Sequence, residues 1–506
     1  MVATVGACGG QSAAHPNALR LPLINDPIFN PVIASDLGSI IVNKVIFPGL
    51  VRPDERLAIA GPRRLLTESP DGLVYTFALR NNVRWHDGAP FTAQDVKFTF
   101  DQIIDLKSGS RLRSDFAAIQ RVDVIDSLTV RFQLKAPFAP FLSLLGYNAG
   151  ILPAHAFAGT TLNGATTFNR QHPIGTGPFM VTEATPEAPC SPKPRYYRAA
   201  PSLDQVVFKV VPDINVQVAQ LRAGELDLVQ LEPANLASVA GIEGVALLQH
   251  PVVQHYYVAF NASKPLFASP SVRRALGFAV NRAAIVQGVM KGYADLPRGT
   301  IPAALTNYFA DSLPAPTFSR DSALALLAAA GWTRGADGML RNAAGAPFRF
   351  TLLVDKGNPT REQSALAVQQ DLKAVGIDVS LQTMEFASEV RDFILPGKFD
   401  ANLIWWTTAP DPDQYAFYVT GQDNNNVHYS NRRVDSLLAL GRAVRDTTQR
   451  RAIYQAFQSE ELRDPPVLVL FYPREILAMR TAVQQWPSLT LRDALRWSER
   501  IRIASR

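Results

Sequence analysis

The sequence of 506 residues has few cysteines, no long apolar run and no dense cluster of charge. Its two cysteines permit at most one disulfide. A membrane-spanning helix needs about eighteen or more consecutive apolar residues, and no such stretch occurs, so we expect no transmembrane helix. The formal net charge is +6, but the basic residues are dispersed, and we expect no nucleic-acid partner.

Motifs for catalysis and for metal binding are also missing. The seven histidines are scattered, and neither H-E-x-x-H nor a metal-spaced cysteine–histidine cluster occurs. There is no G-x-S-x-G motif. The glycine-rich segment Pro173–Phe179 is not followed by Lys-Ser/Thr, so it is not expected to bind phosphate. We therefore predict a protein that is not an enzyme and that has no metal or cofactor.

The length and the order of the predicted elements indicate an α/β protein with two or three domains, since a single core rarely serves a chain this long. An amphipathic helix is predicted over 365–375, where Gly376 ends it, and a strand follows over 377–384. Similar alternation of helices and strands recurs along the chain. It predicts a largely parallel sheet.

The stretch 71–105 is the best-specified local structure. Apolar residues alternate over 73–79, which predicts a strand, and a short second strand is expected over 83–86 after a turn. Thr92 lies where a helix N-cap is expected, and Asp95 can return a hydrogen bond to its backbone. The apolar stripe that follows predicts a helix.

The same stretch carries a family resemblance. Residues 79–100 read LR-x-x-V-R-W-H-D-G-x-P-F-T-A-x-D-V-x-F-T-F, which resembles the signature of the family 5 extracellular solute-binding proteins, the receptors of peptide and nickel ABC importers. Gly175–Phe179 is similar to the GTGP[FY] segment of that family, and Ser271–Arg282 is similar to one of its helices. The resemblance covers nearly the whole chain from Leu21.

The resemblance implies an α/β, two-lobed periplasmic-binding-protein fold of the class II type, with an extra α+β subdomain inserted in the first lobe. We expect residues 1–20 to form a lipobox and flexible tether and residues 48–172 to form the inserted subdomain. Lobe I is then expected from 21–47, 173–256 and 479–506, and lobe II from 257–478. The chain would cross between the lobes near Tyr257 and Leu470, where hinge closure takes place.

The segment from Trp405 to Tyr415 is the strongest candidate for a binding site. Two aromatic residues end a predicted strand, and a proline-bounded loop with two carboxylates follows. Aromatic rings provide contact area, and carboxylates can bind an amine or a guanidinium. The ligand-binding candidates here are Trp405, Trp406, Thr407, Thr408 and Asp411. Strand alternation sends the two rings to opposite sides. The alternative is that Trp405 packs in the core and that the Asp-Pro steps only form turns.

Further candidates come from the resemblance alone. The first loop of the family lies in the cleft wall, which makes Phe29 and Asn30 candidates, although plain loop packing is the alternative. Many peptide-binding members have an aspartate, which binds the peptide α-amine, at the position of Thr408. That anchor would be missing here, or displaced to Asp411 or Asp413. Where the dipeptide branch has an arginine for the peptide carboxylate, this chain offers Lys356 as a point charge.

Taken together, the resemblance implies the extracytoplasmic substrate-binding component of an ABC importer, which binds peptides in an interlobe cleft and delivers them to the permease subunits. We expect a monomer. The same fold binding a non-peptide ligand, such as a metal chelate, haem or a glycan, is the alternative. A secreted hydrolase that uses Asp411 and Asp413 is a remote one, because two carboxylates on one loop rarely bracket a bond.

The N-terminus suggests a lipid anchor. Val5-Gly6-Ala7-Cys8 resembles a bacterial lipobox, in which a diacylglycerol is attached to the cysteine. Cys8 is therefore the predicted lipidation site, and the protein is expected at the outer face of the cell membrane. Too few residues precede Cys8 for a full signal peptide, which would have to begin upstream of Met1. An accidental run of small residues is the alternative.

Overall fold

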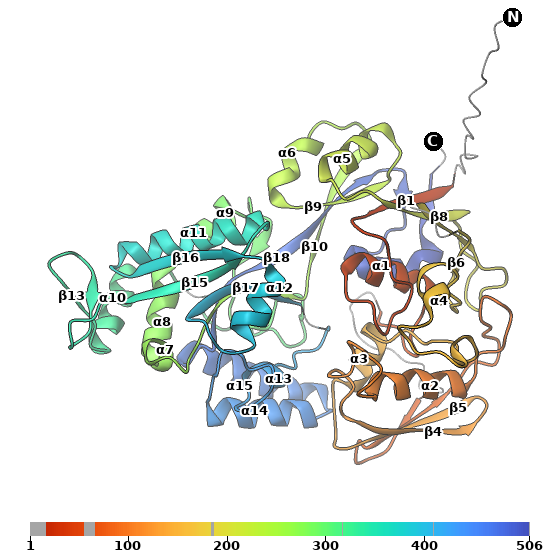
Figure 1. Ribbon diagram of the computed structural model, residues 1–506, viewed down its shortest axis with the longest axis horizontal. Helices are drawn as coiled ribbons and strands as arrows, with labels where there is room; N and C mark the ends of the chain where they lie inside the picture. Colours follow the sequence, from red (N-terminus) through yellow and green to blue (C-terminus); the bar gives the residue numbers. More distant parts are fainter. Residues whose placement is uncertain (1–16, 55–65, 184–186, 316, 408, 505–506) are drawn as a thin grey trace, which may run out of the picture.

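The computed structural model describes residues 17–54, 66–183, 187–315, 317–407 and 409–504. It consists of two bodies side by side (Figure 1). The first body contains β1–β8 and α1–α4, and the second contains β11–β17 and α7–α15. Between them pass β9, β10 and β18. No helix in the described ranges is long and apolar enough to cross a bilayer.

The first body is built around a four-stranded sheet in the order β1-β8-β7-β6. Its strands are β1 (Ala18–Leu23), β8 (Gln205–Val210), β7 (Glu187–Pro192) and β6 (Phe179–Val181), and only β1 and β8 are parallel. Helix α1 (Leu37–Ile46) begins at Asp36, whose side chain accepts a hydrogen bond from the backbone N–H of Ser39. Because β1 begins at Ala18, residues 18–20 belong to this sheet and not to a tether.

A second sheet of the first body has the order β2-β3-β5-β4 and lies within 48–172. Its strands are β2 (Leu66–Glu68), β3 (Val74–Ala78), β5 (Thr129–Leu134) and β4 (Ile119–Asp126). The helices nearby are α2 (Ala93–Ile104), α3 (Phe141–Tyr147), η1 (Ala154–Phe157) and α4 (Thr166–Arg170). The predicted cap of α2 is confirmed, since Thr92 and Asp95 form a reciprocal capping box. The strand expected over 83–86 is wrong, because only a single bridge forms there, between Arg84 and Pro90.

The glycine-rich segment 173–179 packs directly against α1. A Cβ atom on Gly175 would lie 2.1 Å from the carbonyl oxygen of Ile46, and one on Gly177 would lie 2.1 Å from that of Val45. His86 holds the same segment, because its Nδ1 accepts a hydrogen bond from the Gly175 N–H at 3.1 Å and its Nε2 lies 3.1 Å from the Gly177 carbonyl. The glycines are therefore required for close backbone approach.

The largest sheet has the order β10-β18-β11-β17-β15-β16, and β9 and β12 also pair with β18. Its strands are β9 (Leu228–Leu231), β10 (Val245–Pro251), β11 (Gln254–Phe260), β12 (Ala294–Asp295), β15 (Arg349–Asp355), β16 (Asp378–Met384), β17 (Ala401–Thr407) and β18 (Val467–Arg480). The expectation of a largely parallel sheet is wrong. Only β15 pairs in parallel, with β16 and β17, whereas β11 and β18 pair antiparallel with their neighbours.

The helices between β8 and β18 cover this sheet and the connecting region (Figure 1). They are α5 (Ile214–Ala223), η2 (Pro233–Asn235), α6 (Leu236–Val239), α7 (Pro265–Ala268), α8 (Pro270–Ala279), α9 (Arg282–Gly288), α10 (Arg320–Ala329), α11 (Pro359–Ala374), α12 (Phe386–Glu389), the π-helix η3 (Val390–Ile394), α13 (Tyr415–Tyr418), α14 (Arg432–Ala443) and α15 (Thr447–Arg463). Two small strand pairs and two C-terminal helices complete the fold. The pairs are β13 (Thr333–Arg334) with β14 (Leu340–Arg341) and β19 (Val483–Gln484) with β20 (Arg502–Ile503), and the helices are α16 (Leu491–Ala494) and η4 (Leu495–Arg500), which lie between β19 and β20.

Strand β18 connects the two bodies. Its first residues, from Val467 to Phe471, pair with β11, and its last residues, from Arg474 to Arg480, pair with β10. The segment before β9 is joined to the first body, because the Arg20 N–H donates to Asp227 Oδ2 at 2.8 Å and the Asp227 N–H donates to the Arg20 carbonyl at 3.0 Å. The domain boundaries at 256/257 and 478/479 remain predictions.

Candidate ligand-binding site

Three strands of the second body end at one edge of the large sheet. Strands β15 and β17 run in parallel and end at Asp355 and Thr407. Strand β11 runs the opposite way and begins beside them, with Gln254 opposite Thr407. Helix α12, which follows the neighbouring strand β16, lies on the side that faces the first body (Figure 1). Ligands of open α/β sheets bind beyond the carboxyl ends of parallel strands, so this edge is the candidate site.

Trp405 and Trp406 occupy the end of β17, and both are half-buried. Trp405 packs against the core of the second body, which includes Leu352 and Phe471. Trp406 instead contacts the ring of Phe417, with centroids 4.4 Å apart and planes inclined by 60°. Trp405 therefore packs as a core side chain, which was the alternative to its role in ligand binding. Trp406 remains the aromatic candidate for ligand contact. Thr407, the last residue of β17, is also half-buried.

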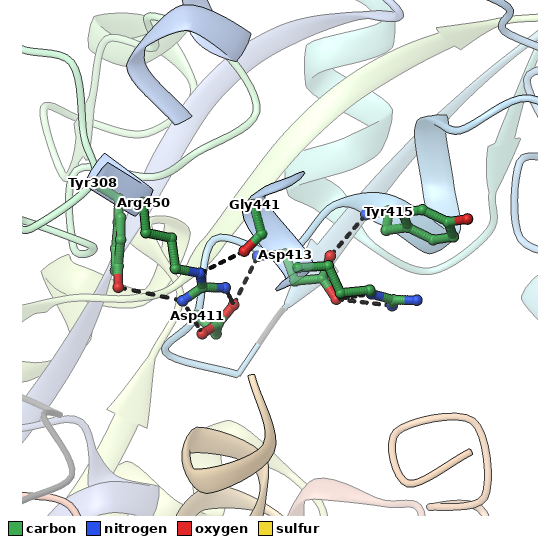
Figure 2. A network of polar contacts seen from close by, with 7 residues as sticks. Tyr308, Asp411, Asp413, Tyr415, Gly441 and Arg450 are labelled. Carbon is green, nitrogen blue, oxygen red and sulfur yellow. Dashed lines mark hydrogen bonds and ion pairs between the residues drawn. The ribbon is translucent and has the colours of Figure 1, made fainter. Parts of the chain in front are cut away.

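Asp411 does not present a free carboxylate. Its Oδ1 and Oδ2 accept hydrogen bonds from Arg450 Nη2 and Nη1 at 2.6 and 2.7 Å, and both side chains are buried. Arg450 also donates to the Gly441 carbonyl at 2.7 Å and to the Tyr308 hydroxyl at 3.3 Å (Figure 2). Such a bidentate, fully desolvated pair fixes the loop after β17.

Asp413 has a second arginine partner. Arg442 Nε and Nη2 donate to Asp413 Oδ2 at 3.0 and 2.8 Å, and the Tyr415 N–H donates to the other carboxylate oxygen at 3.1 Å. Burial raises the pKa of Asp413 and the nearby Asp411 carboxylate raises it further, while Arg442 lowers it. With an arginine on each carboxylate, the arrangement is that of a structural network and not of the acid–base pair that a hydrolase needs.

The other predicted residues lie elsewhere. Phe29 is buried in the core of the first body. Asn30 is also buried, and its amide donates to Asn169 Oδ1 at 3.0 Å and accepts from the Val32 N–H at 3.1 Å. No hydrogen bond or ring contact joins either residue to Trp406 within the described ranges, which matches plain loop packing. Lys356 is exposed, one residue beyond β15. Thr408 and Cys8 lie outside the described residues, so their roles remain predictions.

A buried polar cluster adjoins this edge and was not predicted. Arg361 at the start of α11 pairs with Asp355 at 2.5 Å, and Glu389 of α12 lies in the same cluster. Burial, together with the Asp355 carboxylate, raises the pKa of Glu389 to about 7. Asp355 Oδ1, Glu389 Oε1, and Arg361 Nε and Nη1 are buried without a hydrogen-bond partner in the described structure. Because Asp355 and Glu389 share a single guanidinium, their remaining carboxylate oxygens can accept hydrogen bonds from a polar or cationic ligand group.

This cluster also reaches the connecting region. Glu232, which follows β9, accepts a hydrogen bond from Thr360 Oγ1 at 3.3 Å, and burial raises the pKa of Glu232. Positions 232, 355 and 389 are far apart in sequence, whereas Asp355 and Arg361 are close neighbours. Lys356 was the only candidate predicted in this region, and no local pattern indicated that the neighbouring Asp355 carboxylate would be buried.

Two arginines of the second body also contact the first. Arg445 donates to the Glu68 carboxylate, to the Ser69 carbonyl at 3.3 Å and to the Pro70 carbonyl at 2.5 Å. The Arg442 carbonyl accepts from the Ala139 N–H at 2.8 Å, and the Arg442 guanidinium lies 5.1 Å from the Phe138 ring. Because Arg442 also binds Asp413, this contact between the bodies is linked to the loop after β17.

Residues 48–427 match the family model described as "Bacterial extracellular solute-binding proteins, family 5 Middle". The chain belongs to this family. It is 28% identical over 500 residues to the oligopeptide-binding protein AppA of Bacillus subtilis (strain 168), covering 94% of this chain and 92% of AppA. The resemblance read from residues 79–100 is thereby confirmed, and family 5 solute-binding proteins act outside the cytoplasm.

Solved structures of similar proteins have the same fold. AppA from Bacillus subtilis in complex with a nonapeptide gives a TM-score of 0.79 at 28% identity, with 96% of this chain and 99% of AppA covered. NikZ from Campylobacter jejuni in complex with Ni(L-His) gives a TM-score of 0.81 at 25% identity, with 96% and 99% covered. The predicted fold class, α/β of the periplasmic-binding-protein type, is confirmed.

Proposed function

We propose that this family 5 protein binds peptides between its two bodies and delivers them to the permease subunits of an ABC importer. The observation that carries the proposal is the likeness to AppA, whose structure contains a nonapeptide and which aligns with nearly the whole of this chain. The edge of the large sheet has suitable chemistry for such a ligand, since it combines an aromatic ring, a strand end and a buried polar cluster.

Within this proposal the ligand contacts Trp406 and Thr407 at the end of β17, and its polar groups reach Lys356 and the cluster of Asp355, Arg361 and Glu389. We propose lobe I as 21–47, 173–256 and 479–506, with 48–172 inserted, and lobe II as 257–478. Closure then occurs about the connections β10–β11 and β18. The free energy of ligand binding offsets closure, and the permease recognises the closed form.

A nickel chelate is the second candidate, because NikZ, which is similar to this chain, contains Ni(L-His). Within the described residues, no group of three or more histidine, cysteine or carboxylate side chains is placed to hold a bare metal ion. A chelate would therefore have to bring most of its own metal ligands. This candidate predicts binding of nickel–histidine and no binding of peptides.

The test is mass spectrometry of the ligand that co-purifies with the protein, followed by calorimetric titration with peptides of increasing length and with nickel–histidine. We expect peptides to bind. Because Thr408 stands where many relatives have an amine-binding aspartate, N-acetylated and free peptides should bind with affinities within about tenfold of each other. Binding of nickel–histidine alone would overturn the peptide assignment. A strict requirement for the free amine would overturn the interpretation of Thr408.

We further propose that Cys8 carries a diacylglycerol and that the protein is a monomer anchored to the outer face of the cell membrane. The support is the lipobox-like sequence before Cys8 together with the membership of the family. Expressed with its own upstream signal sequence, the protein should partition into the membrane fraction, and Cys8→Ala should release it. A wild-type protein that remains in the soluble fraction would contradict the anchor.

A further inference from the structure

A pocket lies in the second body, at the opposite end of the large sheet from the candidate site. Its volume is about 320 Å³. It is bounded by α8, by the segment Pro297–Thr300, and by the segment that enters β18. The residues at this end of β18, Val467 and Leu468, pair with Ala259 and Val258 at the far end of β11 from Gln254. The pocket therefore shares no residue with the edge formed by Trp406 and Thr407.

Three arginines give this pocket an excess of positive charge. Arg282 is buried, and its Nε and Nη1 donate to the Val469 and Gly277 carbonyls at 2.8 and 3.0 Å. Burial lowers the pKa of Arg282 to about 10, so it remains charged at neutral pH. Arg274 and Arg298 are half-buried. None of the three guanidinium groups forms an ion pair with a carboxylate of a described residue.

The acidic residues nearby do not neutralise these arginines. Glu461 lines the pocket and accepts hydrogen bonds from Thr300, at 2.6 Å from the hydroxyl and 3.2 Å from the N–H. Burial raises the pKa of Glu461 to about 8, so most of it is protonated at neutral pH. Asp464 is bound to a fourth arginine, Arg273, which it compensates. A desolvated charge without a counter-ion is unfavourable, and a ligand anion would supply the missing one.

The remaining walls are mostly apolar. They are formed by Phe278, Leu462, Leu468 and several prolines. A pocket with apolar walls and several cationic side chains in its lining is suited to a molecule with a hydrocarbon part and an anionic head. We propose that this pocket is a binding site for a small carboxylic acid with an apolar tail, whose carboxylate is held by Arg274, Arg282 and Arg298. Guanidinium groups bind carboxylates in paired, charge-assisted hydrogen bonds, which favours this class of ligand over neutral amphiphiles.

The experiment is isothermal titration calorimetry of the full chain with octanoate, and with 1-octanol as the uncharged comparison. Octanoate should bind with a stoichiometry of one, and octanol should bind at least about tenfold more weakly. Arg274→Gln and Arg298→Gln should each weaken octanoate binding by about tenfold while changing octanol binding little. Two arginine variants are used so that the proposal can still be tested if one of them fails to fold. Arg349→Gln is the control, because Arg349 is exposed and pairs with Asp378 outside the pocket.

A variant that fills the pocket gives a second readout. Ala315 is exposed at its rim, so Ala315→Trp should block both octanoate and octanol without removing an arginine. Trp406→Ala should leave octanoate binding unchanged, whatever it does to peptide binding. The proposal is overturned if octanoate does not bind, if it binds the arginine variants as tightly as the wild type, or if Trp406→Ala abolishes its binding.

Discussion

Arg450 binds both carboxylate oxygens of Asp411, at 2.6 and 2.7 Å, and neither side chain is accessible to solvent. The pair joins the loop after β17 to α15. It therefore sets the position of the chain that leaves Trp406, whichever ligand lies beside that ring. In sequence alone, Asp411 looked like a group that could receive a ligand amine, whereas in the folded protein its capacity to accept hydrogen bonds from a cation is already used by Arg450.

Asp411→Asn should destabilise the protein strongly. Removal of one partner of a buried ion pair leaves an uncompensated charge, here that of Arg450, and typically costs about 3–5 kcal/mol. Urea unfolding followed by tryptophan fluorescence measures the change in the free energy of unfolding. Asp413→Asn is the matched comparison and should cost less, because Arg442 is more exposed than Arg450 and also contacts the Tyr415 ring. Equal effects would contradict the expectation that the more deeply buried pair is more costly to break.

Trp405→Ala and Trp406→Ala should separate stability from binding. Trp405 packs against the core, so its truncation is expected to cost up to about 3–5 kcal/mol of unfolding free energy. Trp406 lies outside that core and contacts the half-buried Phe417 ring, so its truncation should cost much less. If Trp406 contacts the ligand, its truncation should weaken affinity by roughly tenfold or more, as truncation of aromatic anchors does. If only Trp405→Ala lost affinity, Trp405 and not Trp406 would be the ring that contacts the ligand.

Arg445→Ala should favour the open form. The Arg445 guanidinium donates hydrogen bonds to Glu68 and to two backbone carbonyls of the first body. Because these contacts are partly exposed, they should stabilise the contact between the bodies by only about 0.2–1 kcal/mol. Ligand affinity should fall roughly two- to fivefold, and small-angle scattering without ligand should give a larger radius of gyration. Saturating ligand should still reduce that radius. Arg432→Ala, an exposed change on α14, serves as the control. An unchanged radius at saturation in the wild type would contradict hinge closure.

Stability should fall as the pH rises from about 5 to 8. Burial raises the pKa of Glu461 from an ordinary value near 4.5 to about 8, so between these values the folded chain holds a proton that the unfolded chain has lost. One such group contributes a slope of about −1.4 kcal/mol per pH unit in that interval and none above it. Glu461→Gln can still accept from Thr300 and should flatten the decline. Urea unfolding at several pH values tests this, and equal slopes in both proteins would contradict the assignment.

Local features of the fold were predictable because short-range chemistry determines them. The capping box of Thr92 and Asp95 and the left-handed Gly376 just after α11 both depend on neighbours within a few residues. Strand direction was not predictable in this way. Helix–strand alternation suggested a largely parallel sheet, but β11 pairs antiparallel with β17 and β18, which lie far from it in sequence.

The site was only partly predictable for a related reason. Trp405 and Trp406 could be located because strand alternation is local, but the choice of ring for the core depends on packing against a cluster built from several other strands and helices. The partners of Asp411 and Asp413, and the approach of Glu389 to Asp355 and Arg361, are set by contacts between distant segments. A single sequence contains no signal for such pairs.

The position of β18 has a consequence for the order of folding. This strand begins at Val467, near the end of the chain, yet it pairs with β9, β10, β11 and β12, which were synthesised long before it. Until β18 has left the ribosome, the large sheet is therefore incomplete. The strand that connects the two bodies is also missing. Pairing over such a sequence separation is slow, because loop closure precedes the contacts that stabilise it. The nascent chain should therefore stay unfolded for longer than its many helices suggest, which leaves time for transport in a family whose members act outside the cytoplasm.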